Sequence, residues 1–355
     1  MQEFSITKAE TLKPKPDPKT LVFGKTFTDH MFLMNYDADR GWHSGRIVPY
    51  GPLPMEPSSM VFHYAQEVFE GMKAYRTPEG AVQLFRPMDN VRRMNQSCER
   101  LCIPQLPEET ALDGIRALVK AEVDWVPAAP ETSLYIRPFI IATDACLGVH
   151  ASKSYLFCVI CCPVGAYYKE GINPVRIYVE REDVRAVSGG TGHTKCGGNY
   201  AASIRAGERA LEKGYAQVLW LDGVHRKYIE EVGAMNVMFK LNGKIVTPAL
   251  TGSVLPGITR RSCLELLRDW GYAVEERLIS AQELFDAAEA GTLEEAWGTG
   301  TAAVVSPIGE MGWGERTAEI CGGAIGSLTQ KLYNTLTGIQ WGTESDPYGW
   351  TEKIV

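Results

Sequence analysis

The chain has 355 residues, of which 45% are hydrophobic and 22% charged, with a formal net charge of −7. This composition is typical of a globular protein with a large core and excludes a disordered chain. Lys and Arg are scattered along the chain, which excludes a basic face for nucleic acid or anionic lipid and favours small-molecule ligands.

Targeting signals and cysteine usage predict a cytosolic location. The sequence shows neither a long apolar run suited to a membrane helix nor an N-terminal signal pattern. Its nine cysteines are an odd number, and several lie in apolar patterns, which indicates reduced thiols in the core. Cys158 and Cys161 form a CxxC inside YLFCVICCPV, but no second pair follows at zinc spacing. We therefore expect no metal site.

The N-terminal half predicts an extended arm followed by mixed strands and helices. About 30 aperiodic residues form the arm, and the pattern is strand-like over 61–86, with Thr77-Pro78-Glu79-Gly80 as a hairpin turn. Apolar residues at helical spacing predict a helix over 90–102, with Asp89 as its N-cap, and a second one through 115–126.

Glycine and proline punctuation suggests a division into two domains. Strand-like runs SLYIRPFII and YLFCVICC end a smaller N-terminal domain at 1–165. Residues 166–174 are rich in Gly and Pro and predict an interdomain loop, so a larger domain occupies 175–355.

The second domain alternates strands and helices. The pattern predicts strands VRIYVE and AQVLWLDG around the helix AASIRAGERALEKG, and then a hairpin turned by Asn242-Gly243. A helix after Pro256-Gly257 buries Leu264, Leu267 and Trp270. Ser280 and Glu283 form a capping box, and AEICGGAIGSLTQKLYNTLTG predicts a C-terminal helix. The fold class is α/β or α+β.

One lysine, Lys195, lies in the glycine-rich segment GGTGHTKCGGNY at 189–200. A phosphate-binding loop, a Schiff-base lysine and a flexible turn all produce such a segment. The Walker pattern GxxxxGK[ST] is not met, and GxGxxG fails because Lys195 occupies the third glycine position.

A Schiff-base lysine for pyridoxal phosphate needs an acid near the pyridine nitrogen, a donor near the phenolic oxygen and an anion site for the phosphate. Candidates are Glu231 at a strand end, Tyr200, the helix start at Ile258-Thr259 and the hydroxyl of Thr301. Each residue alone also has an ordinary structural explanation, so their joint presence carries the hypothesis.

The chain resembles the branched-chain amino-acid aminotransferases among the fold-type IV enzymes that use pyridoxal 5'-phosphate. The resemblance runs from about Gly24 to near the C-terminus. It rests on the segments GKTFTDHM, HYAQEVFEGMKAY, LFRPMDNVRRM, SLYIRPF, LGVHAS, CPVGAYY, KCGGNY, EEVGAMN, VLPGITRRS and GTGTAAVVSP.

The resemblance implies roles around the cofactor. Lys195 would form the Schiff base and move the substrate's proton, Tyr200 would donate to the phenolic oxygen, and Glu231 would pair with the pyridine nitrogen. The phosphate would bind Arg93, Thr301 and the backbone of Ile258 and Thr259, with Arg185 as a further basic residue near the cofactor.

The resemblance also implies a pocket for substrates. Its apolar wall would consist of Phe27, Tyr64, Phe69, Tyr135, Tyr167 and Ala302, with Leu147 and Val149 supplied by the partner subunit of a homodimer. Arg137 would bind the side-chain carboxylate of glutamate, and Tyr64 with the Thr301-Ala302 backbone would bind the α-carboxylate. The implied reaction transfers the amino group of leucine, isoleucine or valine to 2-oxoglutarate.

Two positions depart from the pattern of some relatives. Ala234 stands where some have threonine, and Ala303 and Ser306 stand where some animal members have a redox CxxC, so thiol regulation there is not expected. Other hypotheses are a D-amino-acid aminotransferase, an aminodeoxychorismate lyase, a nucleotide-binding ATPase and a non-catalytic binding module. EGMKAY and CPVGAY argue against the first two, and the last two require Lys195 to be incidental.

Overall fold

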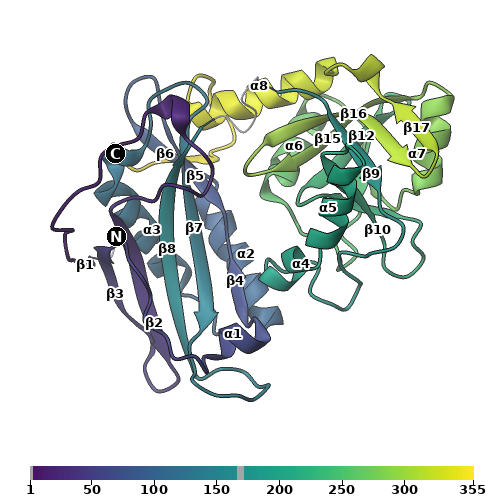
Figure 1. Cartoon of the computed structure of the whole chain (residues 1–355). Coiled ribbons are helices and arrows are strands. Elements are labelled where there is room, and N and C mark those ends of the chain that lie inside the picture. The colour runs from purple at the N-terminus through teal and green to yellow at the C-terminus, as the bar shows by residue number, and fades with distance from the viewer. Residues whose placement is uncertain (1–2, 166–171) are drawn as a thin grey trace. The chain divides into compact units, whose positions relative to one another are not determined.

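A computed structural model describes residues 3–165 and 172–355, which fall into two compact units (Figure 1). Unit 1 comprises Met1–Lys169, Lys195–Gly197 and Gly338–Val355, and unit 2 comprises Glu170–Thr194 and Gly198–Thr337. The expected division assigned everything after residue 174 to one domain, whereas two later segments belong to unit 1. Most of the expected interdomain loop, 166–171, lies outside the described residues.

Unit 1 is built on one mixed sheet. Its strands follow the order β1-β3-β2-β8-β7-β5-β6-β18, and β4 pairs with β7. Only the β1–β3 pair is parallel among the described strands. The strands are β1 (Ser5–Ile6), β2 (His30–Asp37), β3 (Gly41–Pro49), β4 (Glu67–Phe69), β5 (Met72–Arg76), β6 (Val82–Phe85), β7 (Ser133–Ala142), β8 (Ser154–Val164) and β18 (Thr351–Lys353).

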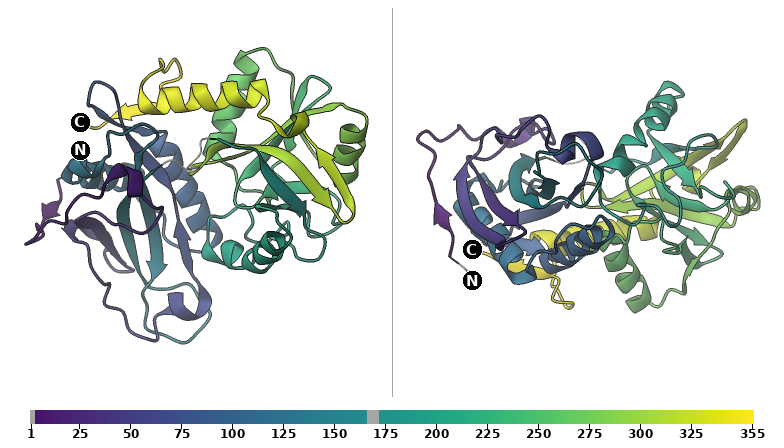
Figure 2. Two further views of the ribbon diagram at one scale, coloured as in Figure 1. Left: turned by 45° about the horizontal axis from the view of Figure 1, so that its top comes forward. Right: turned by 90° about the horizontal axis from the view of Figure 1, so that it is seen from below.

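Helices α2 (Pro87–Arg100) and α3 (Glu108–Ala121) cover one face of this sheet (Figures 1 and 2). Leu134 and Ile136 of β7 belong to the core that these helices share with the sheet. Because side chains alternate along a strand, Tyr135 and Arg137 lie on the opposite face. That second face carries the polar and aromatic residues described below.

The hairpin predicted around 77–80 is confirmed. β5 and β6 pair with Arg76 opposite Val82, and Gly80 adopts φ 88° in a turn closed by its N–H and the carbonyl of Thr77 at 2.9 Å. The strand-like reading of the preceding residues is wrong at its start. Residues Met60–Tyr64 form the short helix α1, which ends in a left-handed residue at Ala65 (φ 48°).

Two predicted helix starts in unit 1 need correction. Helix α2 begins at Pro87, so Asp89 lies in the first turn and pairs with Arg86 at 2.6 Å instead of capping the helix. Proline fits the first helical position because its missing N–H has no partner there. The second helix begins at Glu108 and ends at Ala121, followed by a 3-10 turn, η2 (Val123–Trp125), where one continuous helix was expected.

Unit 2 also has one mixed sheet, in the order β11-β10-β9-β16-β15-β12-β13-β14, with β17 paired to β16. Its strands are β9 (Val175–Val179), β10 (Gln217–Leu221), β11 (Ile229–Val232), β12 (Asn236–Leu241), β13 (Lys244–Pro248), β14 (Val274–Arg277), β15 (Leu293–Gly300), β16 (Val304–Trp313) and β17 (Arg316–Glu319). Parallel pairs occur between β9 and β10, β9 and β16, and β13 and β14.

Helices cover both faces of the β10 region. Val218 and Trp220 pack against Ala206 and Ala210 of α5 (Ile204–Glu212), while Leu219 and Leu221 join the core that contains α7 (Ala281–Glu289). The remaining helices are α4 (Gly197–Ala201), α6 (Ile258–Asp269) and α8 (Ser327–Trp341). Among the described residues, none of the helices has both the length and the hydropathy to cross a membrane.

Turn and cap predictions in unit 2 are largely confirmed. Asn242 (φ 48°) and Gly243 (φ 74°) join β12 to β13, and Ser280 Oγ accepts the N–H of Glu283 at 3.1 Å. Trp270 was expected in the core but is only half-buried at the end of α6. The C-terminal helix begins at Ser327, because positive φ angles at Gly322 and Gly323 interrupt the helical pattern before it.

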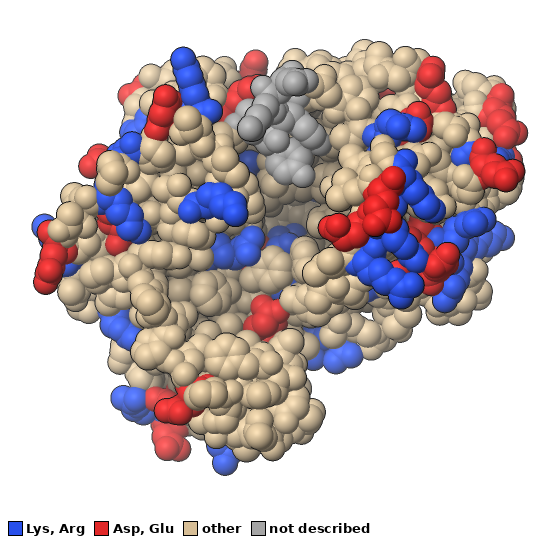
Figure 3. Space-filling view, viewed as in Figure 1, with Lys and Arg blue, Asp and Glu red and all other residues tan. Residues whose placement is uncertain are grey.

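Charged side chains of both signs alternate on the face shown in Figure 3. Arg209 of α5 is one example, since it pairs with Glu180 at 2.9 Å and with Asp183 at 2.8 Å. On this face, the interspersed charges agree with the expectation that no extended basic surface is offered to a polyanion.

Candidate active site

The backbone of Lys195 is fixed to unit 1 along the edge of β4 that faces away from β7. The N–H of Phe69 donates to the carbonyl of Lys195 at 3.0 Å. The N–H of Lys195 donates to Ser97 Oγ of α2 at 3.0 Å, and the N–H of Gly197 donates to the Glu67 carboxylate. Three hydrogen bonds over three residues therefore hold the lysine in register with the sheet.

The side chain of Lys195 extends over an aromatic ring. Its Nζ lies 4.8 Å from the centroid of Phe69. Burial lowers the pKa of Lys195 from 10.5 to about 8, and Arg93 lowers it further, while Glu70 acts in the opposite direction. A substantial fraction of the amine is neutral slightly above neutral pH, as a nucleophile or base requires.

Arg93 is held by a carboxylate that the sequence analysis did not single out. Its Nε and Nη2 donate to the two oxygens of Glu70 at 2.7 and 2.9 Å, and Asn90 donates to the same carboxylate at 2.8 Å. Burial raises the pKa of Glu70, but Arg93 outweighs it and leaves that pKa below its ordinary value. The pair fixes the guanidinium plane, since a bidentate contact defines orientation as well as distance.

Tyr135 and Arg137 lie two residues apart on β7 and so share one face. Arg137 Nη2 donates to the Tyr135 hydroxyl at 3.0 Å, and its guanidinium stacks 4.8 Å from the Phe69 ring centroid. Phe27 packs beside Tyr135 and stacks on Tyr50 with ring centroids 5.0 Å apart. The result is an aromatic wall with one guanidinium in it.

Other predicted pocket residues of unit 1 lie at its surface. Tyr64 ends α1 and is 38% exposed, while Leu147 and Val149 are 69% and 85% exposed on the segment between β7 and β8. Two large apolar side chains so exposed suit a contact surface better than a core. Tyr167 lies outside the described residues.

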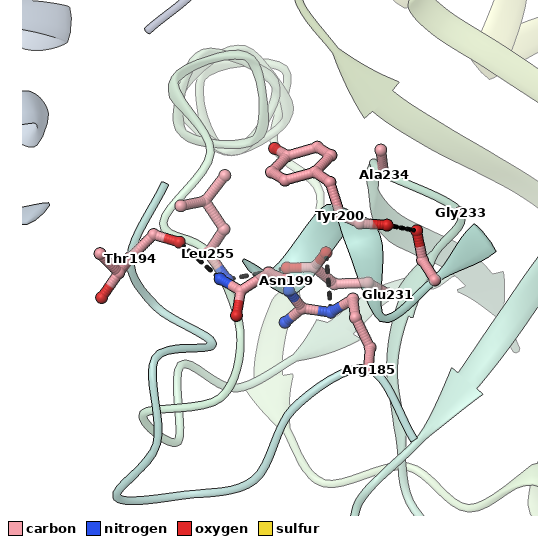
Figure 4. A pocket seen from close by; sticks show the side chains of 9 residues that line it. Arg185, Thr194, Asn199, Tyr200, Glu231, Gly233, Ala234 and Leu255 are labelled. Carbon is pink, nitrogen blue, oxygen red and sulfur yellow. Dashed lines mark hydrogen bonds and ion pairs between the residues drawn. The ribbon is translucent and has the colours of Figure 1, made fainter. Parts of the chain in front are cut away.

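Unit 2 contains a pocket of about 310 Å³, a volume that includes space open to solvent. Figure 4 shows the side chains that line it and the Arg185 guanidinium beside the Glu231 carboxylate. The lining residues are Arg185, Thr194, Asn199, Tyr200, Ser203, Glu231, Gly233, Ala234 and Leu255. Three predicted cofactor residues, Arg185, Tyr200 and Glu231, therefore meet at one pocket.

Glu231 is a buried carboxylate with partners on both oxygens. Oε1 accepts the N–H of Leu255 at 2.7 Å, and Oε2 lies 3.4 Å from Arg185 Nε. A buried anion requires such a cation and donor, because isolated charge is costly away from water. Arg185 also donates to the carbonyls of Gly192 and Ser253, so it links the glycine-rich segment to the loop before α6.

The loop that ends in α6 is positioned by the same group of residues. Asn236 Nδ2 donates to the carbonyl of Leu255 at 2.9 Å, and Gly257 packs so closely on Asn236 that a Cβ would collide with its amide oxygen. Helix α6 then begins at Ile258 without a side-chain cap from Gly257. A helix start of this kind presents N–H donors and the positive end of the helix dipole to an anion.

Thr301 and Ala302 lie in the turn between β15 and β16, where Gly300 pairs with Val304. Thr259 is buried in the first turn of α6. These residues and the pocket all belong to unit 2.

Covalent connection links the lysine to this pocket. Thr194 lines the pocket and is bonded to Lys195, so the two Cα atoms are about 3.8 Å apart across a trans peptide. Tyr200, which also lines the pocket, follows the lysine by five residues. The lysine therefore leaves the rim of the pocket regardless of how the units are placed.

Metal chemistry finds no support in the side-chain groupings. Within the described ranges, no set of three or more His, Cys, Asp or Glu side chains is arranged to hold a metal ion. Cys158 and Cys161 are buried free thiols of β8, as core residues would be.

Comparison with known proteins gives consistent matches over nearly the whole chain. The family model "Amino-transferase class IV" matches residues 67–311. The chain is 56% identical over 353 residues to "Branched-chain-amino-acid aminotransferase 2" of Bacillus subtilis (strain 168), covering 99% of this chain and 97% of that protein. It is 47% identical to "Branched-chain-amino-acid aminotransferase" of Mycolicibacterium smegmatis, covering 94% and 92%.

Solved structures are similar as well. A branched-chain amino acid aminotransferase from a source abbreviated T.th., crystallised with pyridoxamine 5'-phosphate, aligns with a TM-score of 0.78 at 26% identity, covering 93% of this chain and all of that one. The same enzyme complexed with N-(5'-phosphopyridoxyl)-L-glutamate gives a TM-score of 0.77 at 25% identity, with the same coverage.

Proposed function

The chain belongs to the class IV aminotransferases, which depend on pyridoxal phosphate, and we propose that it moves the amino group of leucine, isoleucine or valine to 2-oxoglutarate. Lys195 carries this proposal, because its amine has a lowered pKa beside an aromatic wall that contains one guanidinium. The names of the relatives, at up to 56% identity, support the substrate class.

The donor set fits the cofactor. Lys195 supplies the amine, and the α6 start with Thr259 and Thr301 supplies donors for a phosphate. Glu231 supplies a carboxylate beside Arg185 on the pocket wall. Residues proposed to hold the cofactor are Lys195, Tyr200, Glu231, Arg93, Ile258, Thr259, Thr301 and Arg185.

Pyridoxal phosphate, when bound, withdraws electrons from the bonds at the substrate's α-carbon. The Lys195 amine takes the proton from that carbon and returns it on the other side of the transfer, which its lowered pKa favours. Glu231 holds a proton at the pyridine nitrogen, since a buried carboxylate favours a nearby positive charge. The Tyr200 hydroxyl donates to the phenolic oxygen.

The wall formed by Phe27, Phe69 and Tyr135 suits an aliphatic side chain, whose burial contributes about 0.8 kcal/mol per methylene. Arg137 in the same wall suits the second carboxylate of glutamate and 2-oxoglutarate. We assign Tyr64 and the Thr301-Ala302 backbone to the α-carboxylate, and Tyr167 to the apolar wall. One pocket would thus accept both members of the exchange.

A homodimer is part of the proposal. The exposure of Leu147 and Val149 on one segment supports a contact in which a partner subunit receives them. A cytosolic location is supported by the nine cysteines, all of them free thiols, as in a reducing compartment.

Purified protein loaded with pyridoxal phosphate tests the function directly. We expect glutamate to form from 2-oxoglutarate with leucine, isoleucine and valine, and Lys195→Ala to lose the activity and the lysine-dependent absorbance. Turnover by Lys195→Ala at the parent rate, or no turnover of any branched-chain substrate, contradicts the proposal.

A further inference from the structure

Glu67 is a carboxylate of β4 that no step of the proposed reaction uses. It lies between two functional segments of unit 1, because β4 pairs with β7 along one edge and with the lysine segment along the other. Its side chain accepts the N–H of Gly197, two residues after Lys195.

We propose that Glu67 is a positioning residue that fixes the Lys195 segment and moderates the charge of Arg137. The inference rests on the proposed function, because it concerns how that reaction's lysine and substrate-binding arginine are placed.

The first role follows from the hydrogen bonds. Gly197 has room for no side chain, because a Cβ there would collide with the Glu67 carboxylate. The charged acceptor forms a stronger bond to the N–H than a neutral one would. Together with Ser97 and Phe69, Glu67 leaves the lysine backbone little freedom, so the amine starts each cycle from one position.

The second role follows from electrostatics. Burial raises the pKa of Glu67, while the Gly197 N–H and the charge of Arg137 lower it. Because charge interactions are mutual, an ionised Glu67 also reduces the positive potential at Arg137. The same aromatic wall that holds Arg137 would have to receive an uncharged aliphatic side chain, and a fully uncompensated guanidinium would disfavour that.

Both roles make Glu67 relevant to the balance between two substrates. With Glu67 ionised, Arg137 is positive enough to bind a side-chain carboxylate and yet not so strongly positive that leucine is rejected. A purely structural Glu67 would instead affect both substrates equally.

Glu67→Gln separates charge from hydrogen bonding, because the amide oxygen still accepts the Gly197 N–H. We expect kcat to stay within about twofold. The KM for 2-oxoglutarate should fall and that for leucine should rise, each by about threefold to tenfold, as unit charges near a protein surface allow. Glu56→Gln is the matched control, because it removes the same charge from an exposed side chain.

Glu67→Ala and Ser97→Ala test the positioning role. Each removes one bond to the lysine segment, so kcat should fall by about tenfold to a hundredfold. Hydrogen–deuterium exchange of the cofactor-free protein is the second readout, and the amides at 195–197 should exchange faster in both variants.

The inference is overturned if Glu67→Gln shifts neither KM relative to Glu56→Gln, or if the alanine variants leave both kcat and amide exchange unchanged. The exchange measurement requires no turnover. Its result therefore stands apart from a failure of the proposed function, which an active Lys195→Ala would reveal.

Discussion

At the scale of single residues, the buried cations of unit 1 have the largest effects on protonation. Lys73 on β5 is 7% exposed, and burial lowers its pKa from 10.5 to about 8. The pKa of Lys195 shifts in the same direction. Two desolvated amines on one unit make its stability depend on pH in a range where few other groups titrate.

The sign for Lys73 follows from proton linkage. The folded state releases the proton near pH 8, whereas the unfolded chain retains it to about pH 10.4, so the unfolded state binds more protons between these values. The free energy of unfolding therefore rises with pH from about 8 to 10.5, by at most about 3 kcal/mol for this group.

We predict that Lys73→Met removes this contribution. Denaturant titrations at pH 7, 9 and 10.5 should show the variant more stable than the parent at pH 7, with the difference shrinking as pH rises. A parent and variant that keep the same difference at all three values contradict the assignment of the pKa to burial of Lys73.

For Glu231 we predict a loss of activity that exceeds any loss of stability. Glu231→Gln keeps an acceptor for the Leu255 N–H but removes the charge beside Arg185, and we expect kcat to fall by at least about a hundredfold. Steady-state kinetics checks this. Glu230→Gln is the matched control, because the neighbouring Glu230 accepts only the Ser253 hydroxyl among the described residues and should change kcat by less than about fivefold.

Sequence reasoning predicted Lys195, Tyr200 and Glu231 as cofactor residues, and it did not single out Glu67 and Glu70. The first three lie in a glycine-rich segment or at a strand end, where a polar residue needs an explanation. Glu67 and Glu70 are single acids in a strand pattern. Their importance depends on the pairing of β4 with β7 and on the position of α2, which are long-range contacts without a local signal.

At the scale of elements, two helix glycines show how packing decides the sign of a substitution. Gly207 lies inside α5 and has open space where a Cβ would project, whereas a Cβ at Gly114 of α3 would lie 2.6 Å from the Phe32 ring. Both have ordinary helical backbone, since neither has a positive φ.

We predict opposite effects for the two alanine variants. Gly207→Ala should raise the free energy of unfolding by about 0.5–1 kcal/mol, because glycine is the more flexible residue in the unfolded chain. Gly114→Ala should lower it by about 1–3 kcal/mol through overpacking against Phe32. Chemical denaturation measures both, and a stabilising Gly114→Ala contradicts the packing described for α3.

Elements with local signals were predicted and those without them were not. The turns at Thr77–Gly80 and Asn242–Gly243 carry residues that adopt positive φ, so both hairpins were visible in the sequence. Strands β2 and β3 were not predicted. Polar residues such as Asn35 and His43 interrupt their alternation, and β2 owes its place to pairing with β8, more than a hundred residues later.

At the scale of the whole molecule, the C-terminal residues complete a unit that begins at the N-terminus. β18 pairs with β6, and Ile354 contributes to the unit 1 core. The N–H of Val82 donates to the carbonyl of Val355 at 3.0 Å.

We predict that deleting residues 351–355 destabilises unit 1 by about 2–5 kcal/mol, mainly through the loss of Ile354 and the backbone bonds of β18. Val355→Ala is the control, because this side chain is 58% exposed and should change stability by less than about 0.5 kcal/mol. Thermal unfolding of the three proteins checks the order. Equal melting temperatures for the deletion and the parent contradict a structural role for β18.

The position of β18 also determines when each unit can be finished during synthesis. The ribosome has released all of unit 2 once Thr337 emerges, while the sheet of unit 1 still lacks its last strand. The N-terminal part of the chain must then wait, with the edge of β6 unpaired, until the final residues leave the exit tunnel. In this protein the part made first is the part completed last.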